Sequence, residues 1–187
     1  MRLLLLSCLS GVFSYISVAL PHMLSDWHDI SDDRFFYLPG VLFAVFVLLP
    51  LARESNRPLL RWIGLMAVSV TAWFIAVSVG FQVLPLANQA TVLACGVSGS
   101  VGAAILSVGS RYLVPVDVTV IALLRTVIAG FLGGCIIGLA ITQPRASLYS
   151  ECLYFAGFII WQSSIAMSIF YRREPIQKGA IIHGPRK

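Results

Sequence analysis

Charged residues are scarce in this chain, and their scarcity excludes most soluble proteins. Only 11% of the 187 residues are Asp, Glu, Lys or Arg, whereas 58% are hydrophobic. A water-soluble domain carries about 25% charged residues. The net charge of +5 comes from dispersed Lys and Arg residues rather than from a basic face, so we expect no nucleic acid as a partner. The composition therefore excludes a soluble enzyme and a disordered chain.

Long apolar runs take the place of polar sequence. A spanning helix needs roughly 20 mostly apolar residues, and unpaired backbone groups are so costly in lipid that such a run must be helical. Six stretches qualify and predict an all-α, polytopic transmembrane helix bundle: 3-20, 35-52, 62-80, 91-109, 119-142 and 153-171. We expect residues 1-171 to form this single bundle and residues 172-187 to form a basic cytoplasmic tail.

The basic residues predict the orientation of the bundle, because they accumulate on the cytoplasmic side of a membrane. Ten of the 13 lie on one side of the predicted spans: Arg2, Arg53, Arg57, Arg61, Arg111, Arg172, Arg173, Lys178, Arg186 and Lys187. We therefore expect both termini in the cytoplasm and a multi-pass protein of the bacterial inner (plasma) membrane. An alternative for the first span is a cleaved signal peptide, because Ser17-Val18-Ala19 resembles a cleavage site.

Several chemical groups are absent. No Asp or Glu lies inside a predicted span, which disfavours proton- or sodium-coupled transport. The chain has no nucleotide-binding motif and no Cys-x-x-Cys pair, so we expect no cofactor and no energy-coupling domain. A polar loop contains potential metal ligands: His22, Asp26, His28, Asp29, Asp32 and Asp33. Because their spacing does not match a defined metal site, we favour a solvated loop without metal.

Three polar residues within the spans are candidates for binding a substrate. Arg125 is the charged residue inside a span, and such residues mark functional sites by default. We expect its side chain to snorkel to the cytoplasmic interface or to bond a carbonyl oxygen. The alternative is a site for an anion or a lipid headgroup, with the side chain directed along a strip of small residues toward protein. Gln162 lies near mid-depth of the sixth span, and Ser98 lies in the fourth. Neutral residues of this kind also bond neighbouring helices.

A stripe of small residues in the fifth span predicts close helix packing. Small residues recur there every four positions, and the fourth span has a matching stripe, so both helices present a face on which backbones can approach. We expect the two helices to pack together, with a hinge or a substrate lining as the alternative. The packing residues are Gly99, Ala103, Gly130, Gly134 and Gly138.

One tetrapeptide in the fourth span carries a family resemblance. Gly96-Val97-Ser98-Gly99 resembles the Gly-x-Ser-Gly motif of rhomboid intramembrane proteases, which implies Ser98 as a nucleophile. The family places a histidine in its sixth span, but the sixth span here has none. A serine without a base is a weak nucleophile, so we expect no enzyme and keep a protease as a remote alternative.

These observations predict a membrane protein that binds or moves a small solute or a lipid without an energy-coupling domain of its own. The alternative is a non-catalytic helical subunit of a larger membrane complex. We expect membrane lipids as partners, together with a second membrane protein or further copies of this chain.

Overall fold

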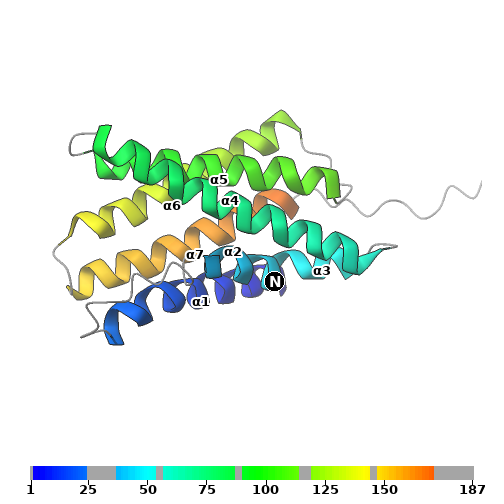
Figure 1. Ribbon diagram of the computed structural model, residues 1–187, viewed down its shortest axis with the longest axis horizontal. Coiled ribbons are helices and arrows are strands. Elements are labelled where there is room, and N and C mark those ends of the chain that lie inside the picture. The colour runs from blue at the N-terminus through cyan, green and yellow to red at the C-terminus, as the bar shows by residue number, and fades with distance from the viewer. Residues whose placement is uncertain are drawn as a thin grey trace, which may run out of the picture.

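The chain is helical throughout the residues that the computed structural model describes, which are 2–24, 37–53, 57–86, 90–113, 119–143 and 147–170. Figure 1 shows the helices running side by side along the long axis of the molecule. Their bounds are α1 (Arg2–Leu24), α2 (Leu38–Phe43), the π-helix η2 (Ala44–Leu48), α3 (Leu49–Arg53), α4 (Pro58–Leu86), α5 (Thr91–Leu113), α6 (Val120–Thr142) and α7 (Leu148–Phe170).

Each expected span corresponds to a helical rod, although several boundaries differ. The four helices α4, α5, α6 and α7 are long and apolar enough to cross a membrane, as in an integral membrane protein. The third expected span, 62-80, lies within α4, which extends to 29 residues. The last expected span, 153-171, starts too late, because α7 already begins at Leu148. Ser147 caps that start by accepting a hydrogen bond of 3.0 Å from the Ser150 backbone N–H.

The second expected span, 35-52, becomes an interrupted rod rather than one regular helix. Its three consecutive segments, α2, η2 and α3, contain 6, 5 and 5 residues. Even together they are shorter than a full span of roughly 20 residues. Ser69 Oγ near the middle of α4 donates a hydrogen bond of 2.7 Å to the Gly40 carbonyl oxygen. The described rod therefore begins beside the middle of α4 and runs back toward the start of that helix.

Neighbouring helices are antiparallel, which brings the ends of the chain's helical part together. The most extensive pairs are α5 with α6, α6 with α7, α4 with α5, and α1 with α7 (Figure 1). In the last pair, Ser7 lies opposite Ser163 and Tyr15 lies opposite Glu151. The start of α1 and the end of α7 therefore share one end of the bundle. We call this the basic end because it carries Arg2, Arg57, Arg61 and Arg111.

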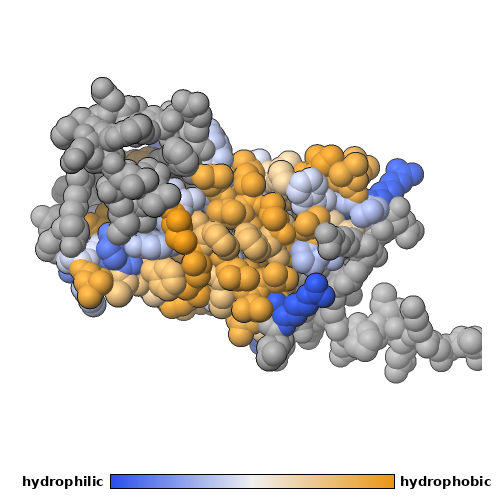
Figure 2. Space-filling model, turned by 90° about the horizontal axis from the view of Figure 1, so that it is seen from below, coloured by the Kyte–Doolittle hydropathy of each residue, from blue (hydrophilic) through white to orange (hydrophobic). Residues whose placement is uncertain are grey.

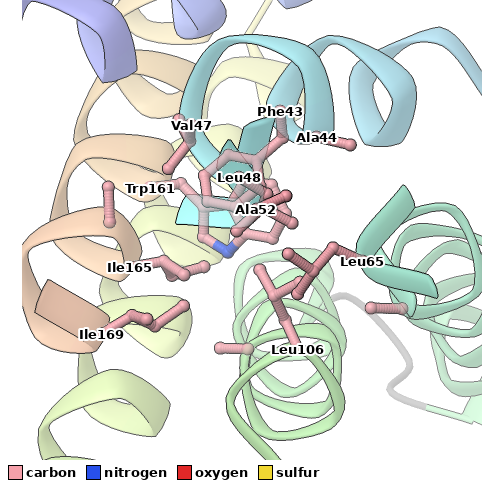
Figure 3. Close-up of a cluster of buried hydrophobic side chains, with 13 residues drawn as sticks. Phe43, Ala44, Val47, Leu48, Ala52, Leu65, Leu106, Trp161, Ile165 and Ile169 are labelled. Atoms are coloured by element: carbon pink, nitrogen blue, oxygen red, sulfur yellow. The ribbon is translucent and has the colours of Figure 1, made fainter. Parts of the chain in front are cut away.

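The apolar side chains fall into two groups, one inside the bundle and one outside. Figure 3 shows the inner group, in which Trp161 of α7 meets Leu48 of η2, Leu65 of α4 and Leu106 of α5. The outer group forms a broad apolar surface across the middle of the face in Figure 2. Such a surface suits contact with lipid. Exposed apolar side chains on α4 and α6 include Ile63, Phe74, Phe81, Leu124, Ile128 and Leu132.

Candidate functional site

A stripe of serines on α1 forms one side of the candidate site. Ser7, Ser10 and Ser14 are each 0% exposed. Their spacing of three and four residues places them on a single face of the helix, and that face packs against α7. Gly11 lies within the same face, where an added Cβ would come within 3.0 Å of the Ile159 Cα. The backbones of α1 and α7 therefore approach closely at this level.

Gln162 of α7 forms the other side, near the middle of the membrane-spanning helix. Its side chain is 0% exposed, and its Nε2 donates a hydrogen bond of 2.7 Å to Ser14 Oγ. Its amide oxygen Oε1 is buried without a hydrogen-bond partner. Ser10 Oγ, one helical turn from Ser14, is also buried and without a partner. Burying a polar atom unpaired is costly, so both atoms need an explanation.

A second bond links the two helices nearer the basic end. Ser7 Oγ lies 2.9 Å from the Leu4 carbonyl oxygen and 3.3 Å from Ser163 Oγ, to which it donates. Cys8 Sγ lies 3.6 Å from the same Ser163 oxygen. The unpartnered Ser10 hydroxyl therefore lies between two bridging bonds, one on each side along α1. We call the set Ser7, Ser10, Ser14, Gln162 and Ser163 the polar seam.

The far end of the α1–α7 pair carries an acidic contact. The Tyr15 hydroxyl donates a hydrogen bond of 2.5 Å to Glu151 Oε2 in the first turn of α7. The Tyr15 ring also packs edge-on against Phe155, with ring centroids 5.3 Å apart. Glu151 corrects the expectation that no acidic residue lies within a span, because the apolar segment of α7 runs from Leu148 to Ile169. A span that begins at residue 153 leaves this glutamate outside it.

A third unpartnered polar atom lies on the opposite side of α7. Trp161 Nε1 is buried without a hydrogen-bond partner and points into the apolar cluster of Figure 3. Its ring meets Trp73 of α4 at a centroid distance of 5.5 Å. Gly133 of α6 has no side chain where Trp161 packs, and an added Cβ there would meet the Trp161 Cβ and Cα within 3.0 Å. Trp161 therefore wedges α7 against α6.

Comparisons with known proteins identify no relative. No family model, no curated protein and no solved structure matches this chain. Function is therefore inferred from the side chains themselves.

The structure places the predicted packing glycines in the interface between α5 and α6. At Gly99, an added Cβ would come within 3.0 Å of the Gly130 carbonyl oxygen. At Gly134 it would meet the carbonyl group of Cys95, and at Gly138 the Cα of Val92, both within 3.0 Å. Ala103 lies against Gly130 in the same interface. This stripe is therefore occupied within the chain itself and is not an open surface for a separate partner.

Ser98 lies away from the polar seam and is bonded to backbone. Its hydroxyl donates a hydrogen bond to the carbonyl oxygen of Ala76 on α4, and its Cβ faces Gly80. A backbone carbonyl accepts a hydrogen bond but does not remove the proton as a general base does. Within the described part of the chain, this contact ties α5 to α4 and gives no support to a nucleophilic serine.

Arg125 and the polar loop also lie apart from the seam. Arg125 is exposed on the sixth residue of α6, so its side chain lies on the outer surface of the bundle rather than along the buried small-residue strip. The loop with His28, Asp29, Asp32 and Asp33, and the side chain of His22, lie outside the described residues. The described residues contain no group of three or more potential metal ligands.

Proposed function

We propose that this protein binds a small uncharged polar solute in the polar seam between α1 and α7 and moves it across the membrane. The proposal depends on the amide of Gln162. This side chain is fully buried at mid-depth, and its oxygen has no hydrogen-bond partner. Burying a polar side chain inside a membrane is costly, and such residues commonly belong to functional sites. The seam adds further hydroxyl groups along the same line, and its members carry no formal charge.

The length of the seam supports movement rather than binding alone. From Ser7 to Ser14, the serines follow one face of α1, and the Tyr15–Glu151 contact extends the polar line toward the far end. At about 1.5 Å per residue, Ser7 to Tyr15 covers roughly 12 Å of a hydrocarbon layer that is about 30 Å thick. A solute would exchange one hydrogen-bonding group for the next over the part of the membrane where desolvation costs most.

The arginines at the basic end bear on how the bundle lies in the membrane. We propose six crossings, with the basic end and both termini in the cytoplasm of a bacterial inner membrane. The exposed arginines Arg2, Arg57 and Arg111 at one end of the described bundle support that orientation. Movement would follow the solute gradient or depend on a partner, because the sequence has no nucleotide-binding motif.

Osmotic flux measurements test this function directly. The purified chain is reconstituted into liposomes, and erythritol entry is followed by stopped-flow light scattering against protein-free liposomes. We expect faster entry with the protein, and entry at the protein-free rate with Gln162→Leu. The matched control is Ser100→Ala, because Ser100 donates a bond of 3.3 Å to the Val127 carbonyl between α5 and α6, outside the seam.

Folding of the variants is checked separately from flux. One interhelical hydrogen bond in a membrane contributes about 0.6 kcal/mol, so Gln162→Leu should retain a folded bundle. Size-exclusion chromatography and tryptophan fluorescence establish this before reconstitution. If glycerol, erythritol and urea all enter wild-type and protein-free liposomes at the same rate, the proposed movement of uncharged solutes is wrong.

A further inference from the structure

We infer that the middle of the polar seam recognises a hydroxyl group, so that the solute is an alcohol or a polyol. The site consists of Gln162 Oε1, Ser10 Oγ and the Ser14 hydroxyl. This inference rests on the proposed function and deepens it by naming the class of ligand.

Gln162 fixes the first requirement, which is that the ligand donates a hydrogen bond. An amide oxygen is an acceptor only, and one of the two N–H groups of the amide nitrogen donates to Ser14 at 2.7 Å. The oxygen is buried without a partner. An ether or a tertiary amide has no proton to give it and would leave it unpaired. A ligand O–H satisfies it.

Ser10 and Ser14 fix the second requirement, which is that the same ligand accepts a hydrogen bond. A serine hydroxyl has one proton to donate and two lone pairs that accept. Ser14 Oγ uses a lone pair for Gln162 Nε2, so its proton is directed elsewhere. Ser10 Oγ is buried and has no partner. A hydroxyl both donates and accepts, so it is the ligand group that matches the acceptor Gln162 Oε1 as well as the serine hydroxyls.

The surroundings of Ser10 limit the size and charge of the ligand. Gly11, the next residue, has no side chain where α1 crosses Ile159, so the two helices approach closely there. A bulky ligand would have to separate them. The three groups of the site are neutral, and a charged ligand would lose its hydration without gaining an opposite charge in return. A small neutral molecule with one hydroxyl presented to the seam meets both limits.

Ligand-observed NMR tests the donor requirement with two small neutral probes that each carry two oxygens. 1,2-Propanediol donates and accepts hydrogen bonds, whereas 1,2-dimethoxyethane only accepts them. Saturation-transfer spectra are recorded on the full chain in detergent micelles, with protein-free micelles as the reference. We expect saturation of the diol and not of the diether. Gln162→Leu should raise the Kd of the diol about tenfold, because the acceptor is lost.

A second variant keeps the test valid if Gln162→Leu does not fold. The outcomes also distinguish this inference from the proposed function. Ser10→Ala removes a partner without adding bulk and should also weaken diol binding, while Ser100→Ala should not. Equal saturation of both probes, or no saturation of either because the seam holds water only, overturns the hydroxyl inference. Diol binding together with entry of glycerol, erythritol and urea at the protein-free rate would instead uphold the inference and refute the proposed movement.

Discussion

The close contact between α5 and α6 allows a quantitative prediction for Gly134→Ala. The added Cβ would lie within 3.0 Å of both the carbonyl carbon and the carbonyl oxygen of Cys95. These are backbone atoms of a neighbouring helix, so no side-chain rotation relieves the overlap. Overpacking of this kind costs about 1–3 kcal/mol, and a rigid backbone neighbour places it at about 3 kcal/mol. Alanine regains about 1 kcal/mol of helix propensity, which leaves a loss of about 2 kcal/mol.

The matched control is Gly64→Ala, at a helix contact of a different kind. There the nearest atoms to an added Cβ are Leu113 Cδ2 and Cδ1, at 3.0 and 3.1 Å. The end of a leucine side chain can turn away by a few tenths of an ångström. The helix-propensity gain should then equal or exceed the cost, so this variant should match the wild type or exceed it by up to about 1 kcal/mol.

Unfolding in mixed micelles measures both variants. The free energy of unfolding is obtained by titrating sodium dodecyl sulfate into dodecylmaltoside micelles. Unfolding is followed by the fluorescence of the four tryptophans, which include the contacting pair Trp73 and Trp161. We expect Gly134→Ala to unfold at lower detergent fraction and Gly64→Ala to remain near the wild type. Equal unfolding free energies for the two variants would show that α5 and α6 do not meet backbone to backbone.

Three further predictions concern the polar seam and its surroundings. Tyr15→Phe should lower the free energy of unfolding by about 1 kcal/mol in the same titration, because Glu151 loses its donor, while Tyr149→Phe, at an exposed ring, should have no effect. Arg125→Ala should leave erythritol flux unchanged, since the side chain is exposed; a fall to the protein-free rate would instead place Arg125 in the solute path. N-terminal sequencing of the mature protein should find α1 retained. A chain beginning after Ala19 would lack Ser7, Ser10 and Ser14 and would contradict a seam built between α1 and α7.

The helical content and the α5–α6 stripe follow from local patterns in the sequence. Hydropathy alone locates each rod, because lipid requires every backbone group to pair within its own helix. The end of α6 is anticipated to the residue, at Thr142. The second rod departs furthest from expectation, because apolar composition does not distinguish a regular spanning helix from the shorter rod with a π-helical turn that the structure has.

The sequence indicates the α7 side of the candidate site but not its α1 side. Gln162 is evident as a polar residue at mid-depth, but its partner Ser14 lies 148 residues away in the chain, and helix pairing brings them together. The spacing of Ser7, Ser10 and Ser14 is a signal that could have indicated a polar face on α1. A hydropathy window excludes Glu151 because hydropathy falls around it. The capping residue Ser147 is the signal in the sequence that marks the start of α7.

The π-helical turn from Ala44 to Leu48 has a consequence for how this rod tolerates change in length. Such a turn accommodates one more residue than an α-helical turn, so removing one residue here would let the rod close into a regular helix. Because the wide turn already absorbs the extra residue, everything beyond the deletion would keep nearly its present orientation relative to Phe43. Ala52, which is fully buried, would stay on the inner face of the rod. A single-residue deletion within this turn should therefore be better tolerated than a deletion in a regular helix such as α4.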